Sequence, residues 1–173
     1  MEGSYRRLSS RVARDRQTRL TEQATTDSPR FVHWIPAIFV AIMISVFSTH
    51  YFSSEQTGRI IFPILHRLFP HTSAHAIHLM HIGIRKMAHV TEFGIFSITV
   101  FHGIRGNRHG WRLTWAVATL LLAVTYAGLD EWHQSFVPLR EARVRDVAVD
   151  AFGALMAQSL VWVYAKCKSN SDS

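Results

Sequence analysis

Residues 31–54 read FVHWIPAIFVAIMISVFSTHYFSS and contain no charged side chain. The hydrocarbon core of a bilayer is about 30 Å thick, and about 20 apolar residues of α-helix cross it. The stretch therefore predicts a membrane-spanning helix over residues 34–53. It is longer than the apolar region of a secretory signal peptide and lacks a small-residue cleavage site, so we expect it to remain as an anchor.

Three more runs of low charge follow, at residues 87–104, 113–129 and 147–165. The first contains two histidines and a glutamate, the second contains no charge, and the third contains a single aspartate. Backbone polar groups in lipid must be satisfied within the spanning segment, which favours helices. The sequence thus predicts an all-α, polytopic membrane protein that forms a four-transmembrane-helix bundle.

Composition supports one membrane domain with polar ends. The chain has 173 residues, of which 48% are hydrophobic and 18% are charged. We expect a disordered cytoplasmic tail over residues 1–30, a transmembrane domain over 31–166 and a C-terminal tail over 167–173. The arginines of the first tail also leave open docking on anionic lipid. Cys167 is the single cysteine, which excludes an intrachain disulfide.

Lysine and arginine counts predict the orientation. With both termini cytoplasmic, the inner segments contain 12 lysines and arginines and the outer segments contain 7. The positive-inside rule favours this arrangement. The net charge of +7 is then explained by topology, and we expect no nucleic-acid partner.

This topology brings the unusual polar residues of the helices to one membrane face. Lys86, His89 and Glu92 are spaced three apart, and Asp146 and Asp150 are spaced four apart, so each set shares a helix face. A carboxylate that faces lipid at midspan costs about 2.5–3.5 kcal/mol. We therefore expect Glu92 and Asp150 to point into the bundle.

The connector that precedes the fourth run adds further polar residues to the same face. Candidates for general acid–base chemistry or metal ligation are His89, Glu92, Asp130, Glu131 and His133. Candidates for binding a polar headgroup are Lys86, Gln134, Arg140, Asp146 and Asp150. The alternative is that these charges only pair with one another and set helix register. The spacings specify no particular metal or cofactor.

A separate group of histidines precedes the second run. His71, His75 and His78 are spaced so that they could share one helix face. They could hold a metal ion, or their imidazoles could sit among lipid headgroups on an interfacial helix. The interfacial interpretation is favoured because no acidic residue accompanies them.

Two motifs resemble those of a known family. Residues 85–94, RKMAHVTEFG, resemble the K-x-x-H-x-x-E-[YF] signature of the VanZ-like family, and residues 130–134, DEWHQ, resemble the start of its second signature. The second signature continues with Pro138, Arg140, Asp146, Asp150 and Gly153. Leu139 stands where the family usually has glycine, and Asp150 stands where asparagine is common.

The resemblance implies a multi-pass protein of the bacterial inner membrane, related to accessory proteins of low-level resistance to teicoplanin-type glycopeptide antibiotics. It leaves three hypotheses for function. The first is binding of lipid or cell-envelope headgroups, with membrane lipids, envelope precursors or glycopeptides as partners. The second is a membrane-embedded hydrolase or transferase that is metal-dependent or uses acid–base chemistry. The third is a structural membrane subunit.

Overall fold

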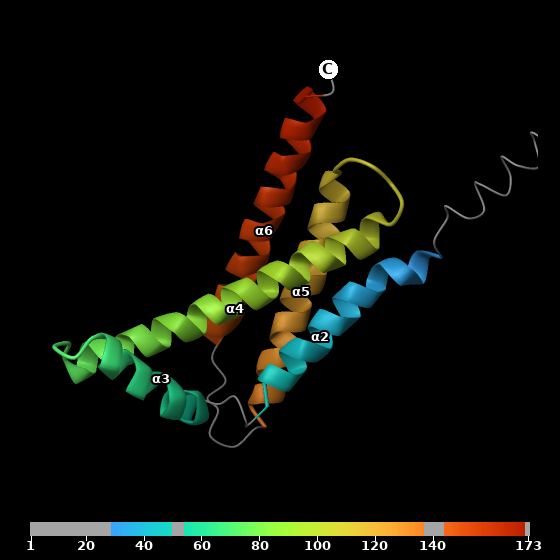
Figure 1. The fold of residues 1–173 in the computed structure, drawn as a ribbon. Coiled ribbons are helices and arrows are strands. Elements are labelled where there is room, and N and C mark those ends of the chain that lie inside the picture. The colour runs from blue at the N-terminus through green and yellow to red at the C-terminus, as the bar shows by residue number, and fades with distance from the viewer. Residues whose placement is uncertain (1–28, 50–53, 137–143, 172–173) are drawn as a thin grey trace, which may run out of the picture.

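The computed structural model describes residues 29–49, 54–136 and 144–171, and these ranges contain helices and no strand (Figure 1). The elements are η1 (Arg30–Trp34), α2 (Ile35–Phe47), α3 (Ser54–Leu68), α4 (Ala74–Arg105), α5 (Leu113–Gln134) and α6 (Val144–Ser171). The predicted all-α class is confirmed.

Three helical segments are long and apolar enough to cross a membrane: Arg30–Phe47, Leu113–Gln134 and Val144–Ser171. They correspond to three of the four predicted spans. The remaining span lies within α4, where two histidines and a glutamate interrupt the apolar run. The four-span count therefore stays a prediction.

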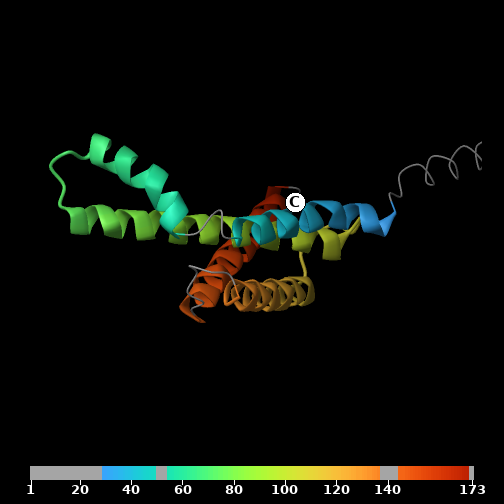
Figure 2. The same ribbon diagram turned by 90° about the horizontal axis from the view of Figure 1, so that it is seen from below.

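α4 begins well before its apolar run. It has 32 residues, which at 1.5 Å per residue makes a rod of about 48 Å, longer than the hydrocarbon core of about 30 Å. Its N-terminal half pairs with α3 in a helical hairpin that projects from the bundle (Figure 2). The segment 55–86, which separates the first two predicted spans, is therefore mostly helical.

The α3–α4 hairpin is held by aromatic packing. The rings of Phe62 and His81 lie 4.8 Å apart, and His81 is buried. Burial and the nearby charge of Arg85 lower the pKa of His81. Ile60 and Ile64 are exposed on α3, so the hairpin keeps an apolar outer face.

The closest helix crossing joins α4 and α6. A Cβ added at Gly153 would lie 2.4 Å from the carbonyl oxygen of Val90, and one at Gly94 would lie 3.5 Å from the carbonyl oxygen of Gly153. Small residues allow helix backbones to approach this closely in membranes. Next to the crossing, the Gln158 amide donates to the Ser97 hydroxyl at 2.9 Å.

The apolar core forms where α2, α4, α5 and α6 meet. Its buried members include Ile44, Phe93, Phe96, Val100, Ala123, Ala127 and Ala154. The Tyr126 hydroxyl on α5 donates to the Ala41 carbonyl at 2.7 Å and lies 2.8 Å from Ser45 Oγ. These contacts join α2 to α5 and explain why the hydroxyl tolerates an apolar setting.

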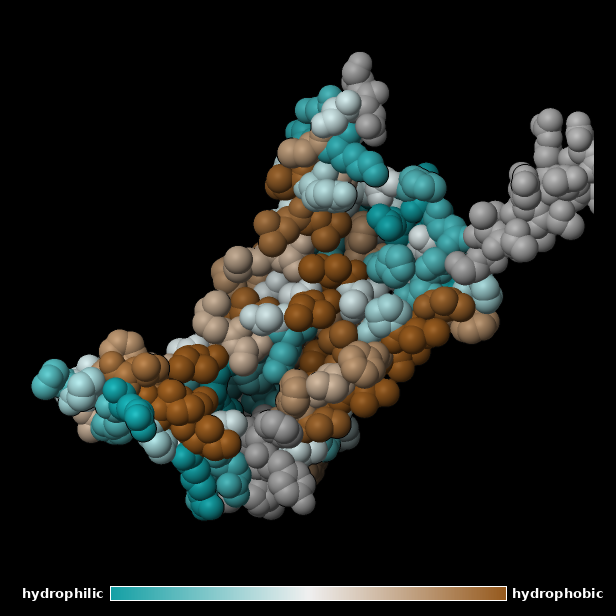
Figure 3. Space-filling view, in the orientation of Figure 1, coloured by the Kyte–Doolittle hydropathy of each residue, from teal (hydrophilic) through white to brown (hydrophobic). Residues whose placement is uncertain are grey.

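The bundle has two chemically different ends, with hydrophobic surface between them (Figure 3). The start of η1, the α4–α5 connector and the C-terminal end of α6 lie at one end, named here the basic end (Figure 1). The described acidic residues lie toward the opposite end, named here the acidic end: Glu55, Glu92, Asp130, Glu131, Asp146 and Asp150. The two ends of the described chain thus share one side, as the predicted topology requires.

We expect the basic end to be cytoplasmic. An alkaline-phosphatase fusion after Lys168 should be inactive, because the enzyme needs translocation to become active. A fusion after His71, in the turn between α3 and α4, should be active and serves as the control. The opposite pattern of activities would reverse the orientation.

Replacement of Gly153 should disrupt the crossing. Gly153→Leu should abolish stable folding, because even its Cβ would overlap the Val90 backbone. Gly128→Ala is the matched control, since a Cβ there meets nothing within 4 Å, and we expect a change within about 0.5 kcal/mol. Thermal unfolding and gel filtration in detergent would measure both. A Gly153→Leu protein that melts like the unmodified chain would contradict the crossing.

Candidate functional site at the acidic end

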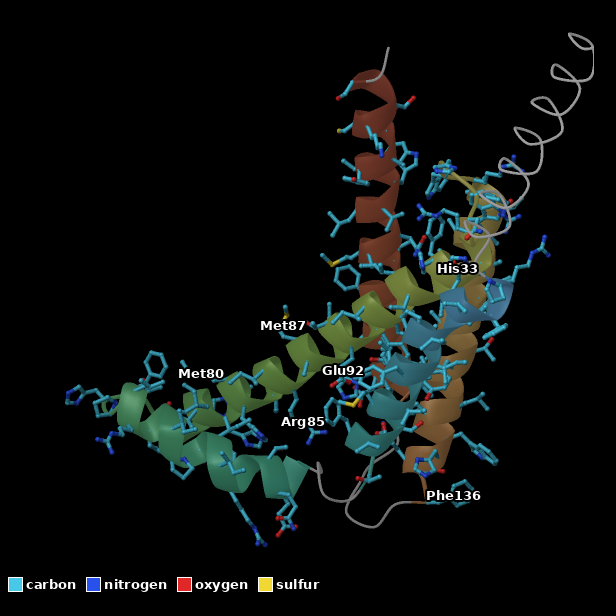
Figure 4. All side chains as sticks on the ribbon, turned by 45° about the vertical axis from the view of Figure 1, so that its right-hand side comes forward. His33, Met80, Arg85, Met87, Glu92 and Phe136 are labelled. Carbon is cyan, nitrogen blue, oxygen red and sulfur yellow. The ribbon has the colours of Figure 1, made fainter. Side chains whose placement is uncertain are left out.

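One face of α4 lines a cavity at the acidic end. The cavity has a volume of about 250 Å³ and is walled by Phe47, Ser48, Thr57, Arg85, Ala88, His89 and Glu92. Arg85, His89 and Glu92 follow the i, i+4, i+7 spacing of a helix stripe. In Figure 4, Arg85 and Glu92 lie on the side of α4 that faces α2, whereas Met87 lies on the other side.

His89 pairs with Asp150 across the α4–α6 interface. His89 Nδ1 lies 3.2 Å from Asp150 Oδ1, and Asp150 is 1% exposed. The two atoms are not aligned as a hydrogen bond, so the attraction is chiefly electrostatic when the imidazole is protonated. Asp130 and Asp146 are close enough to act on Asp150 as well. Asp150 thus points into the bundle, as the sequence predicts, and Glu92 is half-buried at the cavity wall.

The side-chain amide of Gln134 links the C-terminal end of α5 to the same site. The Gln134 side chain donates to Asp130 Oδ2 at 2.6 Å and to Ser48 Oγ at 3.1 Å. All three residues are buried. Because Ser48 also lines the cavity, the DEWHQ segment and the α4 motif share one end of the bundle.

Arg85 is the cation that lines the cavity, and sequence reasoning had selected its neighbour Lys86, which is exposed. Burial lowers the pKa of Arg85 from its usual value, and the nearby Asp146 carboxylate opposes this effect. Successive helix residues point about 100° apart, so adjacent cations face different surroundings. The i, i+4 spacing to His89 was the signal that could have identified Arg85.

The other predicted site residues have mixed placements. Glu131 is buried and His133 is exposed, although both lie within three residues of Asp130. Asp146 is half-buried at the start of α6. Arg140 lies outside the described residues. The structure therefore gathers most of the predicted set at one end and leaves His133 facing outward.

The described ranges contain no preformed metal site. No three His, Cys, Asp or Glu side chains in them are grouped so that they could hold a metal ion. His71, His75 and His78 are all exposed on the hairpin. This position on a projecting helix is consistent with the interfacial interpretation.

Comparison with known proteins identifies the family. The sequence model named VanZ/LLP1 matches residues 11–165. The chain belongs to the VanZ/LLP1 family. No curated protein and no solved structure matches it significantly. In this VanZ/LLP1 chain, the first motif thus provides Arg85, His89 and Glu92 to the cavity wall, and the second motif provides Asp150, which pairs with His89.

The His89–Asp150 pair should be energetically coupled. We expect His89→Gln and Asp150→Asn to give non-additive losses, with a coupling of about 0.5–3 kcal/mol in a double-mutant cycle. Reversible unfolding in mixed micelles would measure it. A cycle that combines Asp150→Asn with Lys86→Gln is the control and should show additivity, since Lys86 is exposed. Equal coupling in the two cycles would contradict a specific pair.

Proposed function

We propose that this VanZ/LLP1 protein resides in the inner membrane as a multi-pass protein and binds the phosphate-bearing headgroup of a lipid or lipid-linked cell-envelope precursor. The observation that carries the proposal is a half-buried guanidinium, Arg85, in the wall of a cavity of about 250 Å³. A cation held in a partly apolar cavity attracts an anion more strongly than one in bulk water.

The cavity wall suits a phosphate that carries other polar groups. The planar fork of Arg85 can donate two parallel hydrogen bonds to phosphate oxygens. Glu92 is placed to accept from a hydroxyl or ammonium group of the same headgroup, and Phe47 and Ala88 provide apolar contact. Arg140, which the sequence assigns to the same face, would add a second cation.

The second candidate is acid–base catalysis of hydrolysis or group transfer. The observation that favours it is the His89–Asp150 pair, in which a buried carboxylate lies 3.2 Å from the Nδ1 atom of an imidazole at the cavity wall. The charge of a carboxylate in this position stabilises the protonated form of the ring. Nε2 of His89 would then take the proton from an attacking water or hydroxyl group.

The family relationship suggests the biological setting. Binding of envelope precursors would connect this chain to low-level resistance to teicoplanin-type glycopeptides. The expected phenotype is a change in glycopeptide susceptibility on expression of the chain, lost with Arg85→Gln. If the chain is instead a structural membrane subunit, Arg85→Gln should leave glycopeptide susceptibility unchanged as long as the protein still folds.

Headgroup binding should depend on the Arg85 fork. We expect Arg85→Gln to weaken retention of a lipid-linked cell-envelope precursor at least tenfold, and Arg85→Lys to have an intermediate effect, because lysine keeps the charge but loses the planar guanidinium. Native mass spectrometry of the chain released from nanodiscs would measure retention. Lys86→Gln is the matched control, since it removes the adjacent, exposed charge. Equal effects of Lys86→Gln and Arg85→Gln would contradict the cavity as the site.

Three further variants test the cavity and separate binding from catalysis. Glu92→Gln should reduce retention, whereas Glu55→Gln should not, because Glu55 is exposed on α3 and already pairs with Arg59 at 3.1 Å. His89→Gln should leave retention within a few-fold if the protein only binds. If a lipid-linked phosphate is converted to product by the unmodified chain, and His89→Gln abolishes this turnover while retaining the lipid, catalysis replaces binding as the function.

A further inference from the structure

The basic end contains a second cavity, between α4 and α6. Its volume is about 320 Å³, and its apolar wall consists of Ile98, Phe101, Leu160 and Val161. His102, Arg105 and Tyr164 complete the lining. The cavity arises because the two helices touch at Gly94 and Gly153 and then diverge toward this end (Figure 1).

Arg105 at this cavity lacks a counter-charge among the described residues. Its Nε atom is buried with no hydrogen-bond partner there. No acidic residue occurs in residues 93–129 or 151–171, which include the parts of α4, α5 and α6 that lie toward the basic end. Arg108, by contrast, donates from its own Nε to the Arg105 carbonyl at 2.9 Å. An anion for the Arg105 guanidinium must therefore come from outside these helices.

The cavity lies at the level of a membrane interface. Four of the five tryptophans lie toward this end: Trp34, Trp111, Trp115 and Trp162. Arg108 and Arg112 stack on the Trp115 ring, at 4.5 and 5.1 Å from its centroid, and Lys166 lies 5.2 Å from the centroid of Trp162. Aromatic and basic side chains together mark the headgroup region of a bilayer.

We propose that this cavity binds an anionic glycerophospholipid. One acyl chain lies against the apolar wall between α4 and α6, and the phosphate accepts hydrogen bonds from Arg105 and from the Tyr164 hydroxyl. A basic group above an apolar cleft between membrane helices suits an anionic lipid, because the basic group attracts the phosphate and the cleft contacts the acyl chain. The site is independent of the acidic-end cavity and lies at the opposite end of the bundle.

The test compares lipid retention by the full chain and its variants. The delipidated protein is reconstituted with equal amounts of phosphatidylglycerol and phosphatidylcholine, and retained lipids are counted by native mass spectrometry. We expect a preference for phosphatidylglycerol of at least fivefold, lost in Arg105→Gln and reduced in Tyr164→Phe. Lys168→Gln is the matched control, since it removes an exposed charge from the same end. Equal loss in Lys168→Gln and Arg105→Gln would overturn the proposal.

Further measurements distinguish a lipid phosphate from a free phosphate ion and test the position of the acyl chain. Inorganic phosphate at millimolar concentration should not displace the lipid, and complete displacement would replace the proposal with a free-anion site. Leu160→Trp, which fills the apolar wall but keeps Arg105, should also lower retention in a protein with unchanged gel-filtration behaviour. Unchanged retention in that variant would overturn the acyl-chain placement. Arg85→Gln should keep this lipid, so failure here is separable from failure of the proposed function.

Discussion

The contact between the backbones of Gly153 and Val90 is the constraint on which the rest of the structure depends. With a Cβ position 2.4 Å from a carbonyl oxygen, no residue larger than glycine fits without moving a helix. This approach brings Asp150, one turn before Gly153, next to His89 on α4. The same approach buries Ser97 and Gln158. The Gln158 amide nitrogen donates to the Ser97 hydroxyl, and that hydroxyl donates to the Ala154 carbonyl, which offsets part of the cost of burying these groups.

The crossing also explains the cavity between α4 and α6 at the basic end. Two straight helices that touch at a point separate on both sides of it, and side chains must fill the widening space. The acidic-end cavity has a different setting, because its lining residues come from α2, α3 and α4 and include Arg85, His89 and Glu92. Toward the basic end, the wall is mostly apolar and the opening carries Arg105. The two cavities thus differ both in the helices that line them and in their chemistry.

The distribution of charge separates the two proposed ligands. At the acidic end, carboxylates surround a single guanidinium at the cavity wall, so a bare anion would be opposed by its neighbours and a headgroup with further polar groups is favoured. At the basic end, the described helices contain no acid, so an anionic lipid meets only attraction. Family membership establishes neither ligand. Both follow from where the helices place their charged side chains.

The sequence by itself determined the helical class, three of the spanning segments, the VanZ/LLP1 motifs and the inward position of Asp150, because hydrophobic length and helical spacing are local properties. Only the tertiary structure showed that Arg85 and not Lys86 lines the cavity, that α4 extends into a hairpin with α3, and that Gln134 reaches Ser48. Helical spacing gives the direction of a side chain around the helix axis, but it does not say which neighbouring helix lies in that direction. That neighbour is decided by where two backbones can approach, which depends on residues as distant in the chain as Val90 and Gly153.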